Sequence, residues 1–348
     1  MMTYATDSQT DEHQSRILDP GFSLTLRPMR YPQFYQHFID AQKNTWTLQE
    51  VSFSTDVADL RDKLNPAELH VVRRIIAFFA TGDTVVANNA CLTLYRHVNS
   101  PEYRMYMGRQ IFEESLHIQA YLTLLDNYLP DMRERTEAFS AINNIPSIKT
   151  KADFCFQWMD AMDEIDILDD DEKKRTFLLN LITFAAAVEG LFFYGAFAYV
   201  YYLRDKGVLN GLGDITNWVF RDESMHMAVA FDLVDVVKEE YPHLWDARME
   251  RDIIAMLTQA IDAETQFAED TLALGVAGLS KADMNSYLKF CADQRLQRLG
   301  IGFRFGGRNN FPFMDFQDLD PLTNFFERRP SNYQIGISGE VKLDDTDF

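Results

Sequence analysis

Two Glu-x-x-His pairs lie 109 residues apart in apolar, helix-forming sequence: Glu114 with His117, and Glu223 with His226. Residues three apart share one face of an α-helix, so each pair can direct a carboxylate and an imidazole at the same point. A lone carboxylate precedes each pair by about one long helix, Asp83 by 31 residues and Glu189 by 34. Four helices would then supply four carboxylates and two imidazoles, which is the ligand set of a two-metal carboxylate site in a helical bundle.

The surroundings of the two lone carboxylates strengthen the metal interpretation. Asp83 lies within FFATGDTVV at residues 78–86, and Glu189 lies within AAAVEGLFF at residues 185–193. An unpaired carboxylate in such apolar sequence would be strongly disfavoured. A single Glu-x-x-His match is more often an ordinary solvent-facing pair, but two matches with buried partners favour a metal site. Carboxylates with one imidazole per metal suit iron or manganese, whereas structural zinc prefers thiolates.

Charge and cysteine content limit the partners and the compartment. The net charge is −20, which repels nucleic acid and anionic membranes, so we expect neither as a partner. The three cysteines are isolated and predict core thiols in a reducing, cytoplasmic location. Residues 177–202 are apolar enough to span a membrane, but Glu189 in the middle favours a buried central helix.

Helix formers dominate residues 65–299, where Gly and Pro are sparse. Asn65-Pro66 and Ser100-Pro101 are typical helix starts. We expect residues 207–213 to be a loop, and glycines and prolines break the helical pattern from residue 300. The predicted domains are a disordered segment at 1–20, a helical domain at 21–320 and a flexible tail at 321–348. The predicted long helices are 65–97, 101–128, 169–205, 214–240, 244–274 and 280–299.

Aromatic residues share the helix faces of the predicted ligands. Tyr121 follows His117 by four residues, so its phenol is expected to point at the metal centre as a redox-active group. Phe193 and Phe197 continue the face of Glu189 and would wall the centre with side chains that exclude water. Without a metal site, each of the three would be an ordinary core aromatic.

These residues carry a family resemblance over nearly the whole chain, from about residue 28 to the end. The sequence resembles the radical-generating small (beta) subunit of class I ribonucleotide reductase. The resemblance rests on the order of the six candidate ligands and on RQIFEESLH at 109–117, VEGLFFY at 188–194 and RDESMH at 221–226. Residues 188–194 and 78–89 are similar to the chlamydial-type branch in particular. The fold implied is a ferritin-like bundle with additional helices.

The resemblance also implies a function. The metal centre would be oxidised, and the oxidising equivalent would pass to the large (alpha) subunit to start reduction of ribonucleotides. The family's transfer chain maps onto His117, Asp222, Trp46 and Tyr333, with an acid kept at Glu50. The last residues, ending in an acidic run and Phe348, resemble the peptide that docks on the large subunit. A homodimer is expected.

Metal identity stays open at this stage. Manganese–iron members of the chlamydial branch have Phe where Tyr121 stands and Glu where Asp83 stands, so this chain has the tyrosyl-radical pattern. Two iron ions are the first expectation, but the same ligands accept manganese with iron or two manganese ions. One rival function is a metal-storage protein, which the chain length, Tyr121, Trp46 and the tail disfavour. The other is a ferritin-like dimetal oxidase, which would explain the site equally well but not the tail.

Overall fold

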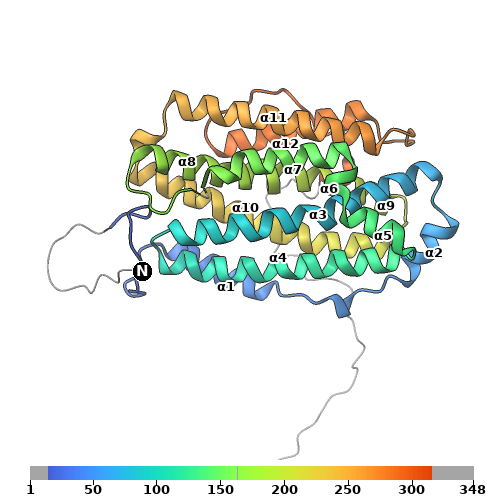
Figure 1. Ribbon diagram of the computed structural model, residues 1–348, viewed down its shortest axis with the longest axis horizontal. Helices are drawn as coiled ribbons and strands as arrows, with labels where there is room; N and C mark the ends of the chain where they lie inside the picture. The colour runs from blue at the N-terminus through green and yellow to red at the C-terminus, as the bar shows by residue number, and fades with distance from the viewer. Residues whose placement is uncertain (1–14, 163, 316–348) are drawn as a thin grey trace, which may run out of the picture.

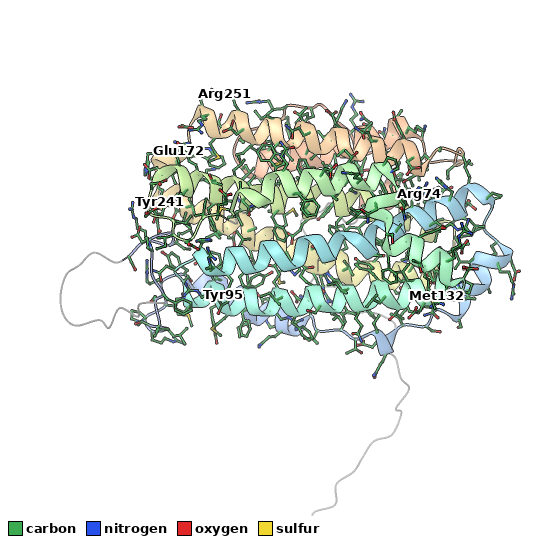
Figure 2. The ribbon with its side chains drawn as sticks, in the orientation of Figure 1. Arg74, Tyr95, Met132, Glu172, Tyr241 and Arg251 are labelled. Carbon is green, nitrogen blue, oxygen red and sulfur yellow. The ribbon has the colours of Figure 1, made fainter. Side chains whose placement is uncertain are left out.

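A computed structural model describes residues 15–162 and 164–315; the side chains of residues 81–93, 159 and 160 are not described. Long helices lie side by side along the long axis of the molecule (Figure 1). Within the described residues there is no strand, and one isolated bridge joins Val276 to Leu279. Tyr95, near the end of α3 (Pro66–His97), and Met132, at the start of α5 (Met132–Phe139), lie toward opposite ends of the bundle (Figure 2). The helix between them, α4 (Pro101–Tyr128), therefore runs along most of the length of the bundle. The predicted all-α, ferritin-like architecture is confirmed.

Four helical segments carry the predicted ligands: α3 (Pro66–His97), α4 (Pro101–Tyr128), η3 (Thr183–Phe193) and α10 (Asn210–Glu240). The starts of α3 and α4 form as the sequence predicts. The side chain of Asn65 accepts from the backbone of Ala67 and Glu68, and the Ser100 hydroxyl accepts from the backbone N–H of Tyr103. Each cap satisfies donors that a helix start leaves open.

The remaining helices surround these four. Two of them, α1 and α2, precede the first helix that the sequence predicted. The elements are α1 (Pro32–Lys43), η1 (Leu48–Glu50), α2 (Ser54–Asp62), α5 (Met132–Phe139), α6 (Ala141–Asn144), α7 (Pro146–Met159), η2 (Asp160–Met162), α8 (Asp171–Ile182), α9 (Tyr194–Asp205), η4 (Pro242–Leu244), α11 (Ala247–Thr271), α12 (Lys281–Arg298) and η5 (Pro312–Met314).

The predicted long helix at 169–205 forms as one continuous rod over residues 171–205, but its middle is π-helical. Helix α8 passes into η3, an 11-residue π-helical segment, before α9 completes the rod. Gly190 lies in this wider turn. A Cβ at Gly190 would lie only 2.7 Å from the carbonyl oxygen of Ala185 and 2.9 Å from Nε of Arg295, so there is no room for a side chain at this position. Residues 171–205 are long and apolar enough to cross a membrane, yet 89% of the most apolar window is buried inside the protein. They form a core helix.

The predicted loop at 207–213 is also too long, because α10 already begins at Asn210. A side chain of helix α2 caps the start of α10. The Asp56 carboxylate accepts from the backbone N–H of Gly211 at 3.0 Å and of Leu212 at 2.8 Å. Leu209, just before the helix, adopts φ +54°, which an L-residue rarely does. A long-range cap therefore replaces the local one that the sequence lacks.

The ordered domain begins before residue 21. Ile17 and Leu18 are fully buried, and the Ile17 carbonyl accepts from the backbone N–H of Asn99 at 2.8 Å. Cys155 and Cys291 are buried, as expected for core cysteines, and burial raises the pKa of Cys155 to about 12.

Candidate metal centre

Four of the predicted ligands converge in the core of the bundle. Each of Glu114, Glu189, Glu223 and His226 offers one ligand atom, and these atoms lie within 4.8 Å of one another. The residues come from α4, η3 and α10, and all are at most 5% exposed. Three carboxylates so close together would repel strongly unless a cation lay between them.

His117 joins the same cluster from α4. Its Nδ1 lies 3.2 Å from Oε1 of Glu223 and 3.7 Å from Oε2 of Glu114. The Nδ1 of His226 lies 3.3 Å from Oε1 of Glu114 and 3.4 Å from Oε1 of Glu189. The ring centroids of His117 and His226 lie 6.1 Å apart, and each ring directs its own Nδ1 at the carboxylates. These two histidines and the three glutamates form a cage.

Several atoms of this cage lack hydrogen bonds within the described part of the chain: Nδ1 of His117, Nδ1 of His226, Oε2 of Glu189 and Oε1 of Glu223. Buried polar atoms are nearly always satisfied, so a cluster of open ones requires an explanation. Carboxylate oxygens and imidazole nitrogens are ligands for iron and manganese, and these donors face one another. The cage therefore fits a bound metal centre.

The carboxylates and imidazoles of the cage change one another's pKa values. Burial disfavours a charged imidazole, but the surrounding carboxylates outweigh burial and raise the pKa values of His117 and His226 well above their usual range. Burial likewise raises the pKa of Glu189, whereas the adjacent imidazoles of His117 and His226 overcome burial at Glu114 and lower its pKa to about 2. The site has a strong preference for positive charge.

The sixth predicted ligand, Asp83, lies in α3, and its side chain is among those not described. Tyr121, 3% exposed, stacks on Phe79 with ring centroids 4.7 Å apart and planes 8° apart. Phe79 in turn lies 6.2 Å from Phe193 and 6.3 Å from Phe197. The two predicted phenylalanines thus pack against Phe79, and Phe79 packs against Tyr121. The sequence analysis did not single out Phe79. Its position four residues before Asp83 was the available signal.

A second set of predicted residues forms a connected chain. Oδ2 of Asp222 lies 3.3 Å from Nε2 of His117 and accepts from the indole N–H of Trp46 at 2.7 Å. The Trp46 ring stacks on His117, with centroids 6.1 Å apart, and packs against Trp218 with centroids 5.1 Å apart and planes tilted by 32°. All but Trp218 are buried. Trp218 was not anticipated, although it precedes Asp222 by one helical turn.

One predicted residue, Glu50, stands apart from these contacts. Glu50 is exposed, and its Oε1 accepts from the backbone N–H of Thr47 at 2.9 Å in a capping box of η1. Tyr333 and the tail at 321–348 lie outside the described residues.

Sequence reasoning missed two polar partners of the cage. Gln110 donates to Oε1 of Glu189 at 3.3 Å, and Oε2 of Glu113 lies 3.0 Å from Nε2 of His226. Both lie on α4, and both are buried. Gln110 precedes ligand Glu114 by one helical turn, and Glu113 stands directly before it, so proximity in sequence was the only signal.

Comparison with known proteins identifies the family. The family model for the ribonucleotide reductase small chain matches residues 23–312. The chain belongs to the ribonucleotide reductase small-chain family. It is 31% identical over 312 residues to ribonucleoside-diphosphate reductase subunit beta of Chlamydia pneumoniae, with 89% of each chain covered. It is 32% identical over 346 residues to the small chain of Schizosaccharomyces pombe, covering 99% of this chain and 84% of that one.

Solved structures share the fold of this small chain. The R2 subunit from Clostridium botulinum superposes with a TM-score of 0.80 at 18% identity, covering 91% of this chain and 98% of that one. The Rnr4 homodimer from Saccharomyces cerevisiae gives 0.73 at 19% identity, covering 90% and 92%. Streptococcus sanguinis dimanganese(II)-NrdF gives 0.70 at 18% identity, covering 84% and 97%. The chain is thus the small subunit of a ribonucleoside-diphosphate reductase.

Proposed function

We propose that this small subunit holds two metal ions in the cage and uses them to generate an oxidising equivalent for its large subunit. The observation that carries the proposal is the pair of buried Nδ1 atoms of His117 and His226, both directed at the same carboxylates without hydrogen bonds to the described residues. The proposed ligands are Asp83, Glu114, His117, Glu189, Glu223 and His226. Two oxidised iron ions are our first choice, because Tyr121 is present; manganese with iron, or two manganese ions, would use the same ligands.

The bound metals would supply one-electron oxidising power, and the protein's residues would direct it. We propose that Tyr121 gives up one electron and its phenolic proton and stores the radical. Phe79, Phe193 and Phe197 surround this region with side chains that offer neither a proton nor a hydrogen bond. Their role is to keep water and reductants away from the radical.

The proposed route out of the centre runs through His117, Asp222 and Trp46. Asp222 accepts from the indole N–H of Trp46 and contacts Nε2 of His117, so the three are in continuous contact. Burial opposes the charge on Asp222, but the His117 contact overcomes it and lowers the carboxyl pKa. Asp222 therefore stays an anion that can orient both neighbours. We propose that Tyr333 and Glu50 continue the route and that the 321–348 tail docks on the large subunit.

We also propose that the subunit forms a homodimer in the cytoplasm. The outer face of α4 presents Gly108, Phe112, Ser115 and Leu122 at helical spacing, with Phe112 50% and Leu122 44% exposed. Two exposed apolar side chains on the helix that also supplies two proposed ligands suit contact with a second copy. Sedimentation of Leu122→Glu is expected to show monomers where the parent shows dimers.

The metal proposal is tested by metal analysis. The parent should bind two ions per chain, and Glu114→Ala or His226→Ala should bind markedly fewer, because each loses a ligand and leaves carboxylates repelling one another. Glu137→Ala, which removes an exposed carboxylate of α5, is the control and should bind two. Full occupancy in both ligand variants would refute the assignment.

Electron paramagnetic resonance of the iron-loaded, oxygen-treated protein tests the radical. Tyr121→Phe should abolish a tyrosyl signal and ribonucleotide reduction. If activity survives, the oxidant is kept on the metals, and the radical assignment fails while the family stands.

A further inference from the structure

Each Glu-x-x-His pair is directly preceded by another acid, Glu113 before Glu114 and Asp222 before Glu223. Each of these two acids contacts the histidine on the other helix. Glu113 on α4 contacts His226 of α10, with Oε2 and Nε2 3.0 Å apart. Asp222 on α10 contacts His117 of α4, with Oδ2 and Nε2 3.3 Å apart. Each helix therefore holds the histidine that the other helix contributes.

The contact with Glu113 determines how His226 faces the cage. An imidazole has two nitrogens, and a partner on one decides which atom is free to bind a metal. With Nε2 held by Glu113, Nδ1 lies 3.3 to 3.4 Å from oxygens of Glu114, Glu189 and Glu223. Glu113 is 1% exposed, so no solvent competes for this contact.

Arg109 in turn fixes Glu113. Its Nε donates to Oε1 of Glu113 at 2.9 Å, one helical turn away on α4, which leaves Oε2 for His226. A buried carboxylate with a cation on one oxygen and an imidazole on the other is satisfied on both sides. The matching acid is also held by a cation, because Nε of Arg221 donates to Oδ1 of Asp222 at 3.2 Å, but its Oδ2 is shared between His117 and Trp46. Asp222 therefore connects its histidine to an indole as well as to a cation, whereas Glu113 connects its histidine to a cation and to no indole.

We propose that Glu113, held by Arg109, is a positioning residue for His226 and sets the metal affinity of the position that His226 serves. This inference rests on the proposed metal-binding function. The division of roles follows from the contacts: Asp222 orients a ligand and meets the transfer route, and Glu113 orients a ligand only. Loss of Glu113 should weaken one metal position and spare the other.

Manganese(II) titration of the metal-free protein tests this, with free ion measured by electron paramagnetic resonance. The parent should bind two ions. Glu113→Leu, which removes the acceptor, should weaken one of the two by about 10- to 100-fold. Glu113→Gln keeps an acceptor oxygen at the same place and should recover most of the affinity, with a several-fold loss remaining. Glu137→Leu makes the same change at an exposed carboxylate and should match the parent.

A mutant cycle separates positioning from general damage. Glu113→Leu should have little further effect in a His226→Ala background, because its target is gone, and its full effect in a His117→Ala background. Thermal unfolding of the metal-free variants should show a lower stability for Glu113→Leu, because Arg109 stays buried without its carboxylate, so metal affinities are compared at a temperature where every variant is folded. Arg109→Met, which frees the carboxylate to rotate, should weaken the same position by less than Glu113→Leu does.

The outcomes are distinct. A Glu113→Leu protein that binds two ions as tightly as the parent overturns the inference, as does equal weakening in the two histidine backgrounds. If Glu113→Leu does not fold, Glu113→Gln decides: an affinity unchanged at both positions overturns the inference. A parent that binds fewer than two ions refutes the metal proposal itself and this inference with it.

Discussion

A buried ion pair outside the metal centre gives the sharpest test of the core. Lys151 on α7 donates to Oε1 of Glu264 on α11 at 2.7 Å, and each residue is 2% exposed. Burial lowers the pKa of Lys151 and raises that of Glu264, and each charge partly offsets this for the other. Each charge therefore stabilises the other in the core.

Lys151→Met removes the cation and keeps most of the side-chain stem. The ammonium lies 3.4 Å from the ring centroid of Phe78 and 4.5 Å from that of Phe267, so a cation–π contribution of about 1–2 kcal/mol is lost as well. Glu264 remains buried and pressed against Gly195, where a Cβ would lie only 2.9 Å from its Oε1. Breaking a buried pair by removing one partner costs about 3–5 kcal/mol, and we expect a loss in that range.

Denaturant unfolding of the metal-free protein measures the effect. Lys149→Met is the matched control, because Lys149 lies on the same helix and pairs with Asp153 at the surface, where the loss should be at most about 1 kcal/mol. The double variant Lys151→Met/Glu264→Leu removes both charges and should be more stable than Lys151→Met. The reasoning fails if Lys151→Met costs no more than Lys149→Met, or if the double variant is the least stable of the set.

Three further predictions concern capping and pH. Asp56→Ala should cost about 2–3 kcal/mol in denaturant unfolding, because two backbone donors of α10 lose their acceptor; Asp62→Ala, at an exposed site of α2, should cost far less. Burial, with the nearby Arg96 charge, lowers the pKa of His97 to about 4, so the unfolded chain takes up this proton first. Its contribution to stability should be complete above about pH 6.5 and decline toward pH 4, and His97→Phe should remove that part of the pH dependence. Metal uptake should release protons and strengthen as pH rises, since the cage raises the pKa values of His117 and His226; calorimetry in buffers of different ionisation enthalpy measures the release.

The sequence by itself determined the helices of the core and the chemistry that they carry. Asn65 and Ser100, each followed by proline, set the starts of α3 and α4, because a cap involves only neighbouring residues. The Glu-x-x-His spacing placed each carboxylate and imidazole on one helix face for the same reason. Local geometry is enough for such features, and they matched the structure.

Only the tertiary structure decided how the helices meet. The start of α10 depends on Asp56, which is more than 150 residues away in sequence. Two contacts between helices depend on the register between α4 and α10: that of Glu113 with His226 and that of Asp222 with His117. No pattern within one helix predicts this register. Within the π-helical segment around Glu189, Arg295 on α12 approaches Gly190 so closely that a Cβ would lie 2.9 Å from its Nε, a contact between segments 105 residues apart. Contacts between distant segments are set by the packing of whole helices, so the sequence indicated which side chains matter and the fold decided what each one touches.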